Sequence, residues 1–265
     1  MKKLIWTYIA AVLLIAGAWS DVQAQNKPLK SYPEDLLAVE YPYYTTVKFK
    51  GKAPGICDFI TANINDDGMP MDTGDVIDAW NHYLRGEPQE KGSELIVDKK
   101  NGYVSHVSDY TIEYDDGVLY CKSLYEMCFW NCADGKHKLF AMSDISMVNG
   151  RFKEGQTTGI YFYLYDNARH IMWQVVDYLL GAEVDSGTEE GYEYNAETKL
   201  HYVKDRETGE QLALNEEEFY KWLDEKPVVV YRLPREGKDI IVEIQRANRT
   251  DTVRLEWDGM MFNRK

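Results

Sequence analysis

The sequence predicts an α+β fold in which antiparallel β structure predominates, arranged as a hairpin meander with two well-signalled helices and a small C-terminal β unit. Aromatic residues make up 13% of the chain, and most of them are tyrosines, which suit the half-buried surface of a pleated sheet. Turn dipeptides of the hairpin type recur in the middle of the chain, and apolar residues recur at helical spacing in two places. An apolar fraction of 45% indicates a folded chain with a hydrophobic core.

The N-terminus has the pattern of a secretory signal peptide over residues 1–24. Lys2 and Lys3 form its basic start, the run 4–18 is apolar, and small residues suited to cleavage end it. The apolar run is shorter than the roughly 20 residues that cross a bilayer. Because the first cysteine is Cys57, no cysteine stands at the cleavage point to carry a lipid. We therefore expect an exported protein, periplasmic or secreted, without a lipid and without a transmembrane segment in the mature chain.

The charge of the chain argues against two classes of partner. Its formal net charge is −14, and loss of Lys2, Lys3 and Asp21 with the signal peptide would make it −15 (−14 − 2 + 1). Nucleic acid and anionic membrane surfaces bind clustered lysine and arginine, whereas the basic residues here are scattered among a larger number of carboxylates. We expect neither as a partner.

The first predicted helix begins just after residue 73. Apolar residues recur there at helical spacing: Val76, Ile77, Trp80, Tyr83 and Leu84. Asp72 or the residue after it can cap the start, and Gly86, followed by a proline, ends the helix. We expect its aliphatic residues and Trp80 to lie in the core, with Asp78 and Asn81 at the surface.

Hairpins are predicted in the middle of the chain. Three dipeptides lie between strand-like runs: Asp116-Gly117, Asp134-Gly135 and Asn149-Gly150. Residues of these types adopt the positive φ that tight hairpin turns require. Their close succession predicts an antiparallel meander from about residue 103 to residue 176.

The mature chain is predicted to have a main α+β domain over 25–182. It opens with an extended lead-in that ends at a short strand over 45–49. The remaining region, 183–265, either belongs to the same domain or stands apart. It begins with an acidic, glycine-bearing connection over 183–197, the best candidate for a boundary or long loop.

A second helix and a C-terminal β unit follow this connection. Asn215 and Glu218 fit a capping box at the start of the helix, which would bury Phe219, Trp222 and Leu223. Polar and apolar residues then alternate over three runs, which predict strands at 228–233, 239–246 and 252–257.

The four cysteines of an exported chain predict a disulfide: Cys57, Cys121, Cys128 and Cys132. In the predicted hairpin, Cys128 and Cys132 share one strand and one face, about 13 Å apart, whereas a disulfide needs Cα atoms within about 7 Å. Cys121 could reach Cys128 only if the chain folds back near Ser123. We expect at most one of these three neighbours to be bridged, with Cys57 as its partner.

No cofactor is expected from the sequence. The alternative is a calcium ion bound in a loop that follows a short helical run. Oxygen-bearing residues alternate as in the first positions of such a loop, at Asn63, Asn65 and Asp67. A short helical run over 56–62 precedes them. The twelfth position, however, is Gly74 where a glutamate is expected. Asp72 or Asp75 could replace the missing ligand, but both are equally well explained as residues at a helix N-terminus.

One strand carries two distinct faces. In an extended chain Ile160, Phe162 and Leu164 share one face, while the other bears the tyrosine row: Tyr161, Tyr163 and Tyr165. If the row is exposed, it forms a stacking platform for sugars or for a partner protein. If a second layer covers it, the tyrosines are core residues, and this alternative is favoured because a strand covered on both faces also appears continuously apolar.

Function is predicted only in outline. The chain has no G-x-S-x-G, S-x-x-K, P-loop or H-E-x-x-H motif, so a non-enzymatic envelope or secreted binding protein is favoured, with a glycan or another envelope protein as its ligand. The alternatives are a secreted hydrolase that acts on glycans with paired carboxylates, and an adhesive or filament component. Two carboxylates about 5–10 Å apart in a cleft would favour the hydrolase.

Overall fold

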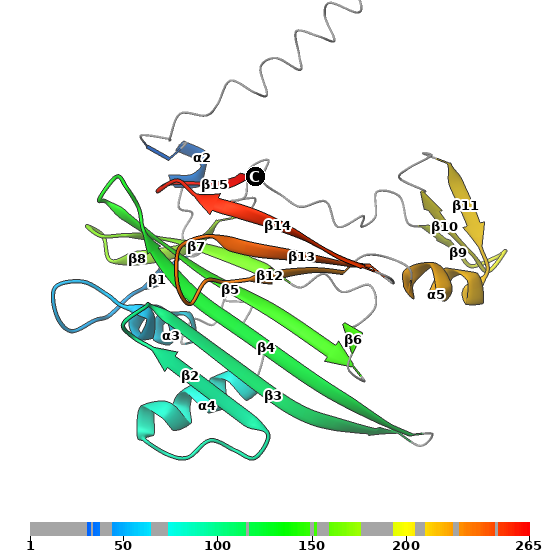
Figure 1. Cartoon of the computed structure of the whole chain (residues 1–265), viewed down its shortest axis with the longest axis horizontal. Helices are drawn as coiled ribbons and strands as arrows, with labels where there is room; N and C mark the ends of the chain where they lie inside the picture. The colour runs from blue at the N-terminus through cyan, green and yellow to red at the C-terminus, as the bar shows by residue number, and fades with distance from the viewer. Residues whose placement is uncertain are drawn as a thin grey trace, which may run out of the picture.

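The predicted fold class is confirmed: antiparallel sheets form most of the molecule, and short helices accompany them (Figure 1). The computed structural model describes residues 31–32, 34–37, 44–64, 74–114, 117–148, 151–152, 159–175, 193–204, 210–224, 228–246 and 249–265. The predicted signal peptide, residues 1–24, lies outside these ranges. Within them, every helix is too short or too polar to cross a membrane.

The main sheet has eight strands and contains the predicted meander. Its strands are β1 (Thr45–Thr46), β2 (Ser93–Asp98), β3 (Tyr103–Tyr114), β4 (Gly117–Asn131), β5 (His137–Val148), β6 (Arg151–Phe152), β7 (Ile160–Asp166) and β8 (Ile171–Val175). The spatial order is β1-β8-β7-β5-β4-β3-β2, β6 pairs with β5, and all pairs are antiparallel.

The hairpin turns lie at or beside the predicted dipeptides. Asp134 and Gly135 fall at the centre of the β4–β5 register, and Gly135 has a φ of 67°. The predicted turn at Asp116-Gly117 is displaced by one residue, because Gly117 already pairs with Tyr114 as the first residue of β4. Strands β5 and β6 flank Asn149-Gly150, which itself lies outside the described residues.

Helices α3 (Ile56–Ile64) and α4 (Gly74–Arg85) cover one face of the main sheet. The α4 helix ends where predicted, because the Gly86 N–H bonds to the Tyr83 carbonyl with Gly86 at a φ of 70°. Val76 and Trp80 are buried, as expected.

Part of the predicted core assignment of this helix is wrong. Leu84 is 54% exposed, Ile77 is half-buried, and Asn81 is half-buried where exposure was expected. The covered stripe runs through the buried residues 76, 79 and 80 and the half-buried residue 83, so Leu84 and Ile77 lie at its border, about a quarter turn or more from its centre.

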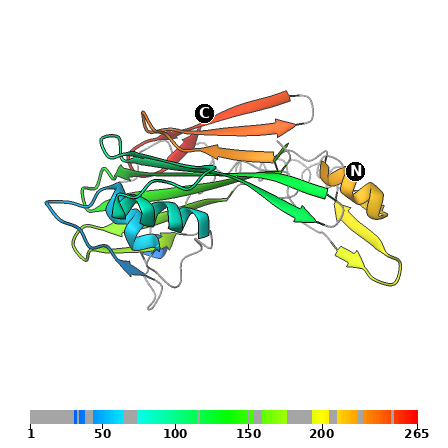
Figure 2. The same cartoon turned by 90° about the horizontal axis from the view of Figure 1, so that it is seen from below.

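The C-terminal β unit packs on the opposite face of the main sheet, so that Figure 2 shows three layers. Its strands are β12 (Val228–Arg232), β13 (Ile240–Arg246), β14 (Arg249–Trp257) and β15 (Phe262–Arg264). Trp130 of β4 lies in this interface, where its indole N–H donates to the Lys238 carbonyl at 2.8 Å and its ring contacts Trp257. One hydrophobic cluster therefore includes residues of both sheets.

The one-turn helix α2 (Glu34–Leu37) was not predicted; an extended lead-in was expected there. It packs on the same face as the C-terminal β unit, since the Trp173 indole donates to the Leu36 carbonyl at 3.1 Å.

A small unit of three strands and one helix lies at the opposite end of the molecule from β1 (Figures 1 and 2). It consists of β9 (Glu193–Asn195), β10 (Leu200–Lys204), β11 (Gln211–Leu214) and α5 (Glu216–Asp224). The predicted capping box is confirmed, because the backbone N–H of each of Asn215 and Glu218 donates to the side chain of the other at 3.0 Å. Within the predicted acidic connection, 183–197, residues 193–195 form β9 where a loop was expected, and residues 183–192 lie outside the described ranges.

A buried carboxyl group joins the two packed sheets. Glu126 of β4 accepts hydrogen bonds from the Tyr103 hydroxyl at 2.9 Å and from the Leu233 backbone N–H at 3.0 Å, just beyond β12. Burial raises the pKa of Glu126 above its ordinary value.

Stability is expected to depend on pH through this group. Because the folded-state pKa of Glu126 exceeds the unfolded-state value, its contribution is complete below the unfolded-state pKa and declines as pH rises through the folded-state pKa. Urea denaturation from about pH 4 to pH 8 should show wild type losing stability relative to Glu126→Gln as pH rises. A stability difference that is constant over this range, or that grows with pH, contradicts the assignment.

Candidate functional site

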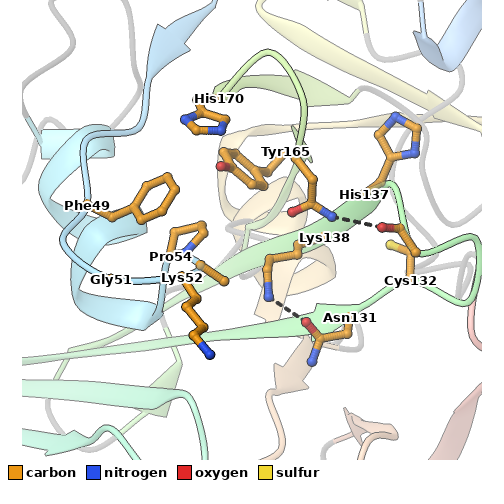
Figure 3. A pocket seen from close by; sticks show the side chains of 13 residues that line it. Phe49, Gly51, Lys52, Pro54, Asn131, Cys132, His137, Lys138, Tyr165 and His170 are labelled. Atoms are coloured by element: carbon orange, nitrogen blue, oxygen red, sulfur yellow. Dashed lines mark hydrogen bonds between the residues drawn. The ribbon is translucent and has the colours of Figure 1, made fainter.

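A cavity of about 470 Å³ opens at one end of the main sheet, where the loop after β1 meets the β4–β5 and β7–β8 turns (Figure 3). We call it the basic pocket. It is lined by Phe49, Gly51, Lys52, Ala53, Pro54, Asn131, Cys132, Gly135, His137, Lys138, Tyr165, Asn167 and His170.

Three neighbouring strands build the floor of the basic pocket. Asn131 of β4 pairs with Lys138 of β5, which pairs with Tyr165 of β7, so all three side chains lie on the helix-covered face. The Lys138 ammonium donates to the Asn131 side-chain oxygen at 2.5 Å and lies 5.0 Å from the centre of the Phe129 ring. Lys138 is only 8% exposed, and this burial lowers the pKa of its ammonium.

Tyr165 contributes a buried donor to the same floor. Its side chain has no exposed surface, its ring packs 5.2 Å from Phe59 of α3, and its hydroxyl has no hydrogen-bond partner among the described residues. Figure 3 shows this hydroxyl directed toward Phe49 and His170. Burial, and after it the charges of Asp166 and Asp58, raise the pKa of Tyr165, so the hydroxyl keeps its proton at neutral pH.

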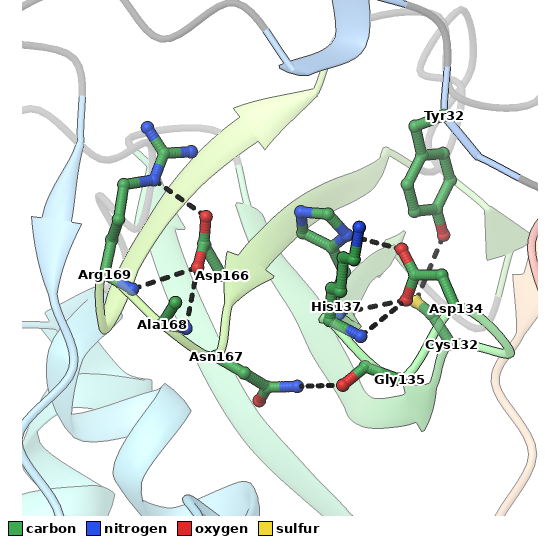
Figure 4. Close-up of polar contacts among 10 residues, drawn as sticks. Tyr32, Cys132, Asp134, Gly135, His137, Asp166, Asn167, Ala168 and Arg169 are labelled. Atoms are coloured by element: carbon green, nitrogen blue, oxygen red, sulfur yellow. Dashed lines mark hydrogen bonds and ion pairs between the residues drawn. The ribbon is translucent and has the colours of Figure 1, made fainter.

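Hydrogen bonds join the two turns at the mouth of the pocket (Figure 4). The Asn167 side chain donates to the Gly135 carbonyl at 3.1 Å, and its backbone N–H donates to the Lys136 carbonyl at 2.9 Å. His170, at a φ of 58°, closes the β7–β8 turn, and its carbonyl accepts from the Val47 N–H at 2.9 Å. These bonds hold together three segments that are distant in the sequence.

The carboxylates nearest these turns are already paired. Asp134 contacts His137 Nδ1 at 2.6 Å, and Asp166 accepts from Arg169 Nε at 2.7 Å. Burial favours the protonated form of Asp134, but hydrogen bonds from the His137 side chain and from nearby backbone N–H groups outweigh it and lower its pKa. Both carboxylates are thus directed to partners in their own turns.

The basic pocket differs in charge from the rest of the chain. Not one of its 13 lining residues is acidic, although the chain has 44 acidic and 30 basic residues. Lys52, Lys138 and His170 line it, and in the described part of the chain no carboxylate forms an ion pair with them. A negatively charged protein therefore has a cavity whose lining contains lysines but no acidic residue.

One wall of the cavity is apolar. The Phe49 ring lies 5.1 Å from the His170 ring, and Ala53 and Pro54 continue the wall beside them. The cavity thus combines an apolar wall with a polar floor, which is the usual composition of small-molecule sites.

The tyrosine row does not form an exposed platform. Tyr163 and Tyr165 are fully buried and Tyr161 is half-buried, because α3 covers this face of β7. The favoured alternative, a row of core residues under a second layer, fits the structure. Tyr165, the last member of the row, lines the basic pocket.

All four cysteines are free thiols in the structure. Because β4 runs unbroken, Cys121 and Cys128 are about 23 Å apart on opposite faces, and the chain does not fold back at Ser123. Cys132 is buried within hydrogen-bond distance of the Tyr32 hydroxyl, 3.1 Å away, and burial raises the pKa of its thiol to about 12. Such buried thiols are unreactive.

The predicted calcium loop is described only at its first residue. Asn63 lies in the last turn of α3 and is buried, whereas Asn65, Asp67 and Asp72 lie outside the described residues. In the described part of the chain, no three acidic, histidine or cysteine side chains are grouped as metal ligands.

The paired carboxylates of a glycan hydrolase are absent from the basic pocket. Burial raises the pKa of both Glu126 and Asp144, but their positions in the register of β4 and β5 place them on opposite faces of the sheet. A second cleft between α4 and the β2–β3 hairpin is lined by four acidic residues: Asp75, Asp78, Glu90 and Asp109. It measures about 150 Å³, below the usual range of ligand pockets, which begins near 300 Å³.

Sequence reasoning missed Lys138, although a signal for it exists. Lys138 alternates with Phe140 and Met142 along β5 and so shares their buried face. A lysine in such a position is rare, because a buried ammonium is costly unless a partner compensates it.

Comparisons with family models, with curated proteins and with solved structures found no match to this chain. Function is therefore argued from the basic pocket itself.

Proposed function

We propose that this chain is an exported, non-enzymatic binding protein that holds a small molecule in the basic pocket. One observation carries the proposal: Lys138 and Tyr165 are buried at the floor of a cavity, the first without a carboxylate partner in the described residues and the second without a hydrogen bond. Such groups destabilise a protein unless something compensates them, and a bound ligand does so. The signal-peptide pattern of residues 1–24 supports export.

The size of the cavity favours a small-molecule ligand over the glycan or protein ligand predicted from the sequence. Its volume of about 470 Å³ falls within the range of about 300–1,000 Å³ typical of small-molecule sites. A protein partner would instead need an exposed face of roughly 800 Å². The buried tyrosine row does not supply such a face.

Thermal unfolding of the exported chain with a panel of small molecules tests this function. The panel should include sugars, amino acids, organic acids, organic phosphates and calcium. A ligand present at about 100 times its dissociation constant adds about 2.7 kcal/mol of stability. We expect at least one member to raise the midpoint of wild type.

Two matched variants locate the binding site. Ala53→Trp would fill the cavity from its wall, whereas Ala168→Trp adds the same bulk at an exposed position of the β7–β8 turn that does not line the pocket. The midpoint shift should disappear in the first variant and persist in the second. A panel without any shift, or an equal shift in both variants, contradicts the proposal.

A further inference from the structure

We propose that the ligand is a small organic anion whose carboxylate or phosphate group accepts hydrogen bonds from Lys138 and Tyr165 at the floor of the basic pocket. This inference rests on the proposed function and specifies its ligand class. It follows from charge, from the balance of donors and acceptors, and from the shape of the cavity.

Lys138 supplies a buried ammonium group to the basic pocket. Its ammonium is buried, its only polar contact in the described residues is the neutral Asn131 amide, and Lys52 and His170 line the same cavity. An anion would supply the missing negative charge where solvent screening is weak. Because the chain as a whole is negative, this local cluster is not a consequence of general basicity.

The polar groups of the floor are mainly donors. Lys138 can only donate, its bond to the Asn131 oxygen occupies one lone pair of that acceptor, and the Asn131 amino group is a further donor. The Tyr165 hydroxyl has a proton and no acceptor for it. A carboxylate only accepts at neutral pH and an organic phosphate group mainly accepts, whereas a sugar hydroxyl also needs an acceptor.

The register brings these donors to one place. Residues opposite each other on paired strands have Cβ atoms about 5 Å apart, so Lys138 and Tyr165 project side by side toward the cavity. Figure 3 shows the Tyr165 hydroxyl beside Phe49 and below His170, with Lys138 further down. The two donors are therefore neighbours at the floor of the basic pocket.

The apolar wall indicates that the anion has an organic body. Phe49, Pro54 and the His170 ring face the cavity, and a bare inorganic ion would leave these surfaces without contact. A planar or unsaturated group fits best against aromatic rings.

Isothermal titration calorimetry of the exported chain distinguishes the contribution of the ligand's negative charge from that of its organic body. The probes are benzoate and phenyl phosphate as organic anions, inorganic phosphate as the anion without a body, and benzamide as the neutral counterpart of benzoate. We expect one or both organic anions to bind more tightly than inorganic phosphate and benzamide. Comparison of the two organic anions identifies the preferred oxyanion.

Four variants test the residues. Lys138→Met should weaken binding of the organic anion about tenfold or more, since a hydrogen bond to a charged group is lost, while Lys136→Met removes the same charge from the exposed turn nearby and should change it less than twofold. Tyr165→Phe should weaken binding without lowering the thermal midpoint of the free protein, because the deleted hydroxyl has no hydrogen bond to lose. If Lys138→Met fails to fold, Lys52→Met at the exposed rim should still weaken binding of the anion.

The outcomes distinguish this inference from the proposed function. Benzamide binding as tightly as benzoate, or Lys136→Met weakening binding as much as Lys138→Met, overturns the anion assignment. If neutral panel members shift the thermal midpoint through the pocket but no anion binds, the proposed function stands and this inference fails. If Ala53→Trp also leaves every panel shift intact, both fail.

Discussion

Replacement of Trp80 by alanine is expected to lower the free energy of unfolding by about 3–5 kcal/mol. Trp80 is 1% exposed in the core between α4 and the main sheet, and its indole N–H donates to the Thr61 hydroxyl at 3.2 Å. The substitution removes a large ring from close packing and also breaks a link between α4 and α3. Equilibrium unfolding in urea measures the change.

Leu84→Ala is the matched control on the same helix. Because Leu84 is largely exposed, its truncation should change stability by less than about 0.5 kcal/mol. A change below about 1 kcal/mol for Trp80→Ala, or similar effects of the two substitutions, would mean that α4 does not pack on the sheet as described.

Tyr163→Ser is expected to cost several kcal/mol, about 3–5 if it matches other large-to-small aromatic substitutions in cores. Tyr163 has no exposed surface, and its ring packs 5.7 Å from the Phe140 ring. The serine would leave a cavity under α3 that this rigid layer fills only in part.

Tyr120→Ser provides the comparison for this second substitution. It makes the same chemical change at a position that is 66% exposed on β4, so its effect on unfolding should stay within about 0.5 kcal/mol. Little destabilisation by Tyr163→Ser would instead indicate that the tyrosine row is accessible and would restore the platform interpretation.

Local signals account for the elements that could be predicted. The α4 helix, the reciprocal cap between Asn215 and Glu218, and the hairpin at Asp134-Gly135 each depend on residues within a few positions of one another. Such patterns specify backbone conformation through φ preferences and short-range hydrogen bonds. The one-turn α2 has too few residues to show a helical repeat, so it was missed.

Local signals do not show which faces of a strand or helix are covered by another layer of the fold. Alternation along β7 separates Ile160, Phe162 and Leu164 from the tyrosine row, but it does not state what lies above either face. The packing of α3 on one side and of β12–β15 on the other decided that both are buried. Leu84 shows the same limit, because helical periodicity does not define how wide the buried stripe is.

The sequence by itself determined the α+β class, the antiparallel hairpins, the helix ends and the signal-peptide pattern, since each depends on neighbours along the chain. The basic pocket was decided only by tertiary structure. Lys138 meets Asn131 and Tyr165 through the register of three strands, and the loop that carries Lys52 reaches them from more than 75 positions away. The partners of a buried charge depend on which strands pair and which turns meet. A local sequence pattern does not show which residues far apart in the chain come into contact.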